Sequence, residues 1–144
     1  MPFGTINLRF PSLAVATWGM LFAQTLSAAN YGVVFEATWS ATNHPNAYVS
    51  SAHFSTPIGT THNDQIQLWG PERLASPGIE GVAETGSVRL IRSEISSAID
   101  AGNAFGFIQG STFDSPGTNR FGFEAIESFP LVSVVSMIAP SPDW

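Results

Sequence analysis

The sequence has 144 residues, of which 44% are hydrophobic and 11% charged, so it can form a single domain with a sizeable core and few charge-laced helices. It contains no lysine, and its net charge of −6 argues against a nucleic-acid partner, which would need a basic surface. It also contains no cysteine, which excludes disulfides, thiolate metal sites and cysteine nucleophiles.

The first 29 residues have the pattern of a secretory signal peptide. Arg9 precedes an uncharged, apolar run over residues 13–26, and small residues follow it. This run is shorter than the ~20 residues that a membrane-spanning helix needs. We therefore predict export to the periplasm or the extracellular space, with cleavage near Ala28 or Ala29. The mature domain would comprise residues 30–144 and would not span a membrane.

Strands are predicted in the first half of the mature chain. Residues 31–40 are rich in aromatic and β-branched side chains and lead into a polar stretch at residues 41–51. This composition indicates a strand followed by a loop. A second, short strand is predicted around Ile66 to Trp69.

The middle of the chain predicts a helical insertion. Pro77 and Gly78 interrupt a helical spacing of apolar residues, so we expect only one or two helical turns, which begin near Ser76 with proline at the first helical position. Residues 87–101 predict a longer amphipathic helix that ends at Gly102. Its expected apolar face consists of Leu90, Ile91, Ile95, Ala98 and Ile99, with Glu94 and Asp100 outside it.

Three further strands are predicted at residues 104–109, 120–126 and 131–138, separated by turn-forming residues. The last strand is apolar on both faces, which is typical of the interior of a sandwich. Such a strand needs neighbours on both edges, and the sequence stops soon after it, at Trp144. We therefore expect a mainly β domain that is truncated at its C-terminus.

Few residues suggest catalysis. His44, His53 and His62 are nine residues apart, and no single helix or strand would bring them together, so hydrogen bonding in turns and loops is the favoured interpretation over a metal site. The chain has no G-x-S-x-G nucleophile motif. A small secreted hydrolase that uses carboxylates, with Glu84 and Glu124 as candidates, is an alternative to a non-enzymatic protein.

Two binding hypotheses come from single residues. Trp39, Tyr48 or Trp69 could stack on a sugar face, as in a carbohydrate-binding module, although burial of these rings in the core is favoured. Asp143 follows two prolines at the end of the last strand, and loops at the ends of β-sandwiches can gather oxygen ligands for calcium. One aspartate cannot hold calcium alone.

A series of motifs resembles the spondin N-terminal domain family, the module of F-spondin and mindin that also occurs in secreted bacterial proteins. The motifs come in the family's order from about residue 31 to the end of the chain. They are WSATNHP at residues 39–45, SSAHFS at 50–55, GTTHN at 59–63, LW at 68–69, LASPGI at 74–79, VAETG at 82–86 and LVSVVSMIAPSPDW at 131–144.

This resemblance implies a C2-like antiparallel β-sandwich and a non-enzymatic extracellular module, which in animals is linked to matrix and cell-surface adhesion. It implies an extracellular protein or glycan surface as the partner. It also implies a calcium site in which Asp143 joins two acids from a later D-A-G-T-D-like segment. The sequence ends before that segment and before the family's remaining strands.

Overall fold

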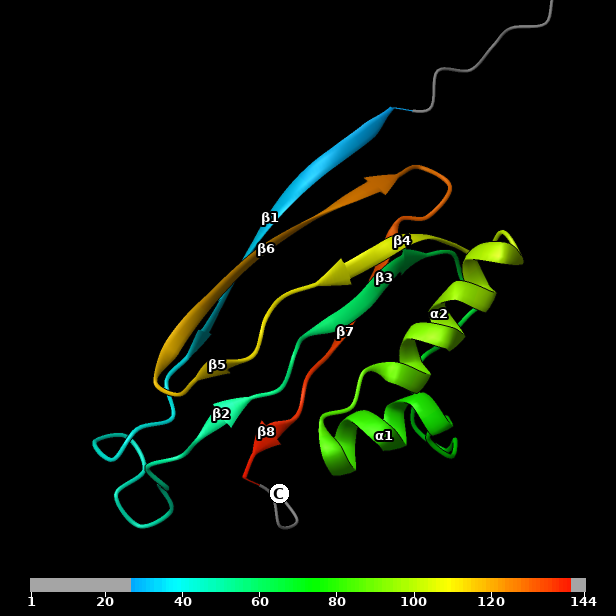
Figure 1. Cartoon of the computed structure of the whole chain (residues 1–144). Coiled ribbons are helices and arrows are strands. Elements are labelled where there is room, and N and C mark those ends of the chain that lie inside the picture. Colours follow the sequence, from blue (N-terminus) through cyan, green and yellow to red (C-terminus); the bar gives the residue numbers. More distant parts are fainter. Residues whose placement is uncertain (1–26, 141–144) are drawn as a thin grey trace, which may run out of the picture.

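The computed structural model describes residues 27–140 (Figure 1), which form eight strands and two helices. The elements in chain order are β1 (Ala28–Ala37), β2 (His53–Phe54), β3 (Ile58–His62), α1 (Pro77–Thr85), α2 (Arg89–Asp100), β4 (Ala104–Gln109), β5 (Phe113–Asp114), β6 (Gly117–Ile126), β7 (Leu131–Val135) and β8 (Ile138–Ala139).

One β layer consists of three chain segments that run side by side. The antiparallel ladders β4-β3-β7 and β5-β2-β8 use the same three segments in succession, with β2–β3 in the centre. Two backbone hydrogen bonds join the ladders where the segments bend: Ser55 N donates to Met137 O at 2.8 Å, and Gly110 N donates to Pro57 O at 3.0 Å. The two ladders therefore form one bent sheet.

The second β layer is the long ribbon of β1 and β6. The two strands pair antiparallel from Ala28 opposite Ile126 to Ala37 opposite Gly117. The ring of Phe35 on β1 packs against Phe54 and Phe113 of the first layer, with ring centroids 4.9 and 5.0 Å apart.

A hydrogen bond also connects the layers, because Thr61 Oγ1 of β3 donates to Glu124 O of β6 at 3.2 Å. The architecture is an antiparallel β-sandwich with a helical insertion between β3 and β4, as the sequence predicted.

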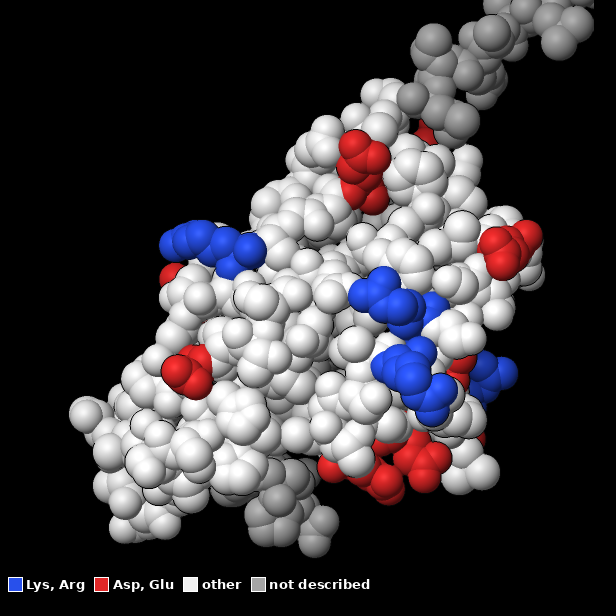
Figure 2. All heavy atoms as spheres, viewed as in Figure 1, with Lys and Arg blue, Asp and Glu red and all other residues white. Residues whose placement is uncertain are grey.

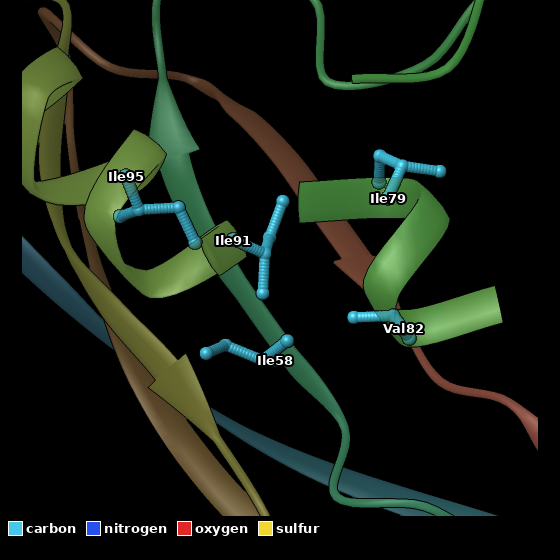
Figure 3. Close-up of a cluster of buried hydrophobic side chains, with 5 residues drawn as sticks. All are labelled: Ile58, Ile79, Val82, Ile91 and Ile95. Atoms are coloured by element: carbon cyan, nitrogen blue, oxygen red, sulfur yellow. The ribbon is translucent and has the colours of Figure 1, made fainter. Parts of the chain in front are cut away.

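The two helices cover the other face of β3 and enclose the main hydrophobic core (Figure 3). Figure 3 shows side chains from β3, α1 and α2 pointing toward one another. They are Ile58, Ile79, Val82, Ile91 and Ile95, all buried. Full burial of an aliphatic side chain contributes about 1.5–3 kcal/mol. This cluster therefore holds the helices on the sheet.

The first helix begins as its sequence indicates. The Ser76 side chain caps it by accepting a hydrogen bond from Ile79 N at 3.2 Å, and Pro77 is its first residue. The helix ends at Gly86, which has a left-handed φ of 69°. It is longer than the one or two turns predicted, because Gly78 is buried against the second helix instead of ending the first.

The second helix is confirmed over Arg89–Asp100, with two corrections to its predicted faces. Ile91 and Ile95 are fully buried, but Leu90 is 37% exposed and lies at the edge of the apolar face. Glu94 was predicted to lie outside that face, yet its carboxylate is partly buried and binds the first turn of α1. A hydrogen-bonding partner on a neighbouring helix reverses the preference of a carboxylate for solvent.

The predicted strands at residues 104–109 and 120–126 are confirmed, the latter beginning three residues earlier, at Gly117. The predicted strand at 31–40 is β1, shifted to Ala28–Ala37. The strand predicted at 66–69 is wrong, because these residues lie in the connection between β3 and α1. The nearby strand is β3. Its sequence, Ile-Gly-Thr-Thr-His, has a single aliphatic residue, so its hydrophobic pattern does not predict a strand.

The predicted strand 131–138 is interrupted, and its interior position in a complete domain stays a prediction. It divides into β7 and β8, and within residues 27–140 β7 pairs with β3 alone. Val132 and Val134 are 47% and 44% exposed. The apolar residues on both faces predicted an interior strand. Among the described residues, β7 forms an edge.

Candidate functional site

A groove runs beside the edge strand β7. It is a hollow of about 520 Å³ lined by Leu68, Trp69 and Ile79 on one side and by residues 132–135 of β7 on the other. We call it the β7 groove. Ile79 is held by α1, whereas Leu68 and Trp69 belong to the connection that leads from β3 to α1. The indole of Trp69 is 70% exposed, although Leu68 packs against the core.

A second hollow lies on another side of Trp69. It has a volume of about 380 Å³ and is lined by residues 67–70 together with Arg73, Leu74 and Ser76. The guanidinium of Arg73 donates to Gln67 Oε1 at 3.4 Å, and Leu74 is 99% exposed. Trp69 therefore separates an apolar groove from a hollow with a polar rim.

The chemistry of the β7 groove is that of a binding surface. Its lining carries aliphatic and aromatic side chains and the hydroxyl of Ser133, with no ionisable side chain. A general acid or base must be titratable and within hydrogen-bond reach of the reacting group. The groove can therefore bury apolar groups of a partner but has no residue suited to proton transfer.

The three histidines lie apart, and the rings of His53 and His62 are hydrogen-bonded. His62 is buried on β3, where its Nε2 is 2.8 Å from Ser133 Oγ and its Nδ1 is 2.7 Å from Asn63 O. His53 lies on β2, and its Nδ1 is 2.8 Å from Ser51 O. The third, His44, is in an exposed loop. Across residues 27–140 no three histidine or acidic side chains gather in a way that could hold a metal ion.

The structure does not bring the two candidate carboxylates together. Glu84 is on α1, in the helical layer, whereas Glu124 is on β6, in the ribbon on the other face of the central sheet. A glycosidase needs its two carboxyl groups within about 5–10 Å, on the two sides of one bond. These two residues therefore cannot act as a pair in this fold.

The aromatic candidates for sugar stacking differ from one another. Trp39 is buried, and its ring meets that of Tyr48 edge-on with centroids 6.1 Å apart, so packing is the role of both residues, as favoured from the sequence. Trp69 is the opposite case, since most of its surface is open to solvent.

Two predictions fall wholly or partly outside the described residues. Asp143, the predicted calcium ligand, lies beyond them, as does nearly all of the predicted signal peptide. The predicted cleavage position near Ala28 or Ala29 falls at the start of β1. Cleavage and calcium binding both stay predictions.

Sequence reasoning missed the β7 groove and the role of Glu94. The signal for the groove was present in the five uncharged residues Leu131–Val135, but they were interpreted as an interior strand. Nothing in the local spacing around Glu94 indicates its contact with Ser76 and Gly78, because that contact depends on how the two helices pack.

Charges are dispersed over the face in Figure 2. Arginine and acidic side chains occur there singly or in small groups of both signs, separated by wide uncharged areas. Such a surface offers no extended field of one sign to steer a strongly charged partner. On this face, apolar contact and hydrogen bonding therefore offer more to a partner than charge does.

Residues 27–140 thus form a β-sandwich domain with an uncharged groove beside β7. Residues 29–144 match the Spondin_N family, so the chain belongs to the spondin N-terminal domain family, as its motifs predicted.

Two groups of relatives give the scale of the similarity. The chain is 29% identical over 95 residues to Spondin-2 of Homo sapiens, which covers 65% of this chain and 29% of that protein. It is 31% identical over 109 residues to Spondin-1 of Rattus norvegicus and of Homo sapiens, which covers 70% of this chain and 13% of each relative. The chain thus spans less than a third of the length of these relatives.

No helix within residues 27–140 is both long and apolar enough to cross a bilayer.

Proposed function

We propose that the protein is a secreted, non-enzymatic binding module of the spondin type, which holds an extracellular protein partner in the β7 groove. Membership of the Spondin_N family supports an extracellular role. The observation that carries the proposal is the groove itself, where an exposed tryptophan and the uncharged strand β7 line the same hollow. Exposed apolar surface of this kind is typical of interaction sites.

The arrangement of titratable groups supports a role without catalysis. The groove is lined by no acid or base, and the carboxylate pair suggested by the sequence is divided between two layers. Binding needs only the complementary surface that the groove offers.

Calcium binding at Asp143 remains a separate prediction. The described residues contain no cluster of three acidic or histidine ligands, so they do not supply a calcium site by themselves. We therefore assign the ion no part in binding at the β7 groove.

A glycan is the second candidate partner, favoured by the open indole of Trp69. Gln67 and Arg73 border the hollow beside it and could bond to sugar hydroxyls while the ring stacks on the sugar face. A glycan array probed with the full chain and with Trp69→Ala tests this alternative. Hits that the substitution removes would support it, and an array without hits would reject it.

The main proposal is tested on surfaces coated with single, purified extracellular-matrix proteins. The probes are the full chain, the variant Val132→Lys in the groove, and the variant Val34→Lys as a matched control. Val34 lies on β1, away from the groove, and is 50% exposed, close to the 47% of Val132.

We expect at least one coat to retain the chain and the control, and to retain Val132→Lys about tenfold more weakly, because a charge in the interface must be desolvated. Retention by no coat, or equal retention of all three proteins, would overturn the proposal.

A further inference from the structure

The hollow on the other side of Trp69 is formed by one short segment of the chain. All of its lining residues lie within residues 67–76, in the connection between β3 and α1. This segment is held at both ends, because Leu68 packs against the core and Ser76 caps α1. Its shape is therefore set by contacts within the connection and with the helical layer. We call it the Arg73 hollow.

The backbone and two polar side chains give the Arg73 hollow a defined arrangement. Glu72 has a left-handed φ of 64° and is the one residue other than glycine with a positive φ among residues 27–140. The next residue, Arg73, donates from its guanidinium back to Gln67 Oε1 at 3.4 Å. The amide of Gln67 lies so close to Gly70 that a Cβ there would clash with it. Strained backbone of this kind is typical of ligand-binding loops.

The charge of Arg73 is available to a ligand. A guanidinium has five N–H donors, and the bond to Gln67 uses one of them. Arg73 forms no ion pair with any acid that the structure describes, and no acidic side chain lines the hollow. The indole of Trp69 lines the same space and is 70% exposed. A cationic, fork-shaped donor thus stands beside an open aromatic ring.

We propose that the Arg73 hollow binds a glycan through a sugar residue that carries a carboxylate. Arg73 pairs with the carboxylate through two parallel N–H···O bonds, the geometry that its planar guanidinium favours. Trp69 stacks on the apolar face of the sugar ring, and Gln67 bonds to a neighbouring hydroxyl. This inference rests on the second candidate function, a glycan partner, and names the class of sugar.

The composition of the hollow favours an isolated acidic sugar over other ligands. The chain has a net charge of −6, and the hollow contains a single arginine, so a polyanion would be repelled more than it is held. A neutral sugar would leave the guanidinium charge unpaired, and the carboxylate of a peptide would leave the indole uncovered. The volume of about 380 Å³ lies in the range of small-ligand sites, about 300–1,000 Å³.

A matched pair of sugars tests this proposal on the full chain. The probes are methyl β-D-glucuronide and methyl β-D-glucoside, which differ only in that a carboxylate replaces a hydroxymethyl group. Acetate is the third probe and supplies a carboxylate without a sugar. Binding is measured by isothermal titration calorimetry to the unmodified chain and to Arg73→Gln, Trp69→Ala and the control Arg120→Gln. Arg120 is exposed on β6, in the other β layer. Thermal melts establish that the variants are folded.

We expect the glucuronide to bind at least about tenfold more tightly than either the glucoside or acetate. Arg73→Gln should remove the difference between the two sugars, because it removes the charge that pairs with the carboxylate. Trp69→Ala should weaken the binding of both sugars, since it removes the stacking surface that they share. Arg120→Gln should bind all three probes as the unmodified chain does.

Three results would overturn the inference. They are an absence of glucuronide binding at about 10 mM, equal affinity for the two sugars, and equal affinity for the glucuronide and acetate, which would indicate a carboxylate site without sugar recognition. If the two sugars bind equally and Trp69→Ala weakens both, the glycan candidate stands and the preference for an acidic sugar fails. If neither sugar binds and the glycan array has no hits, the glycan candidate fails as well. The main proposal is judged separately by Val132→Lys, because Val132 does not line the Arg73 hollow.

Discussion

Replacing Glu94 with alanine should loosen the contact between the two helices. Gly78 N donates to Glu94 Oε1 at 2.7 Å, and Ser76 Oγ donates to Glu94 Oε2 at 2.7 Å. A hydrogen bond to a charged acceptor contributes about 1.5–3 kcal/mol, and a carboxylate at a helix N-terminus about 0.3–1 kcal/mol. Since the Ser76 hydroxyl can turn to other partners, we expect Glu94→Ala to lower the free energy of unfolding by about 2–4 kcal/mol.

Urea unfolding of the full chain, followed by far-UV circular dichroism, measures this loss. Glu80→Ala is the matched control, because Glu80 lies in the first turn of α1, the turn that Glu94 contacts, but is exposed, and its loss should matter far less. Glu94→Gln should fall between the two, since its amide oxygen can accept from Gly78 N without the charge. If Glu94→Ala costs no more than Glu80→Ala, the carboxylate does not hold the helix pair together.

Three further experiments test the core and the predicted metal site. Gly78→Ala should destabilise the protein by about 1–3 kcal/mol in urea, because the new Cβ would lie 2.6 Å from Ile91 Cα. Gly106→Ala should not destabilise the protein in this way, because its new Cβ would meet nothing within 4 Å. An equal loss of stability in the two variants would contradict this reasoning. Thr60→Val removes a buried hydroxyl that donates to Gly106 O at 2.7 Å, so we expect a loss of about 1 kcal/mol in thermal melts; an unchanged melt would show that this bond adds no stability. Because one aspartate cannot hold calcium alone, we expect the Tm of this chain to be the same in excess calcium and in chelator; a rise that Asp143→Ala removes would show instead that a usable site exists without the two later acids.

The sequence correctly predicted the helices and strands whose neighbouring residues favour the structure that they adopt in the fold. Ser76 and Pro77 mark a helix start, and residues 104–109 form a strand with the predicted bounds. Family membership was also accessible, because the motifs keep their order along the chain. In each case the signal lies within a few residues and does not depend on distant contacts.

The failures come from residues whose environment is set by distant segments. The central strand β3 is buried along its whole length, although two of its five residues are threonines. Their hydroxyls are satisfied by carbonyl oxygens of Gly106 on β4 and Glu124 on β6, partners that no local pattern reveals. Ile66 to Trp69 showed the stronger strand pattern, yet they form a connection that carries the wall of the groove.

The candidate site was only half visible from the sequence. Trp69 was recognised as a possible binding residue, but the strand that it faces was interpreted as interior. Burial of Val132 and Val134 depends on whether another strand lies beside them, and apolar composition alone does not encode that neighbour.

The pairing of β1 with β6 has a consequence for how the protein is made. The first described strand finds its whole partner in Gly117–Ile126, near the other end of the chain, whereas α1 and α2 are neighbours in sequence. Local helical contacts form quickly, but long-range strand pairing is slow, on the order of milliseconds to seconds. A chain that crosses a membrane N-terminus first would present β1 long before β6 arrives. On that route the sandwich can close only after β6 has followed, and until then β1 lacks the strand with which it pairs along its whole length.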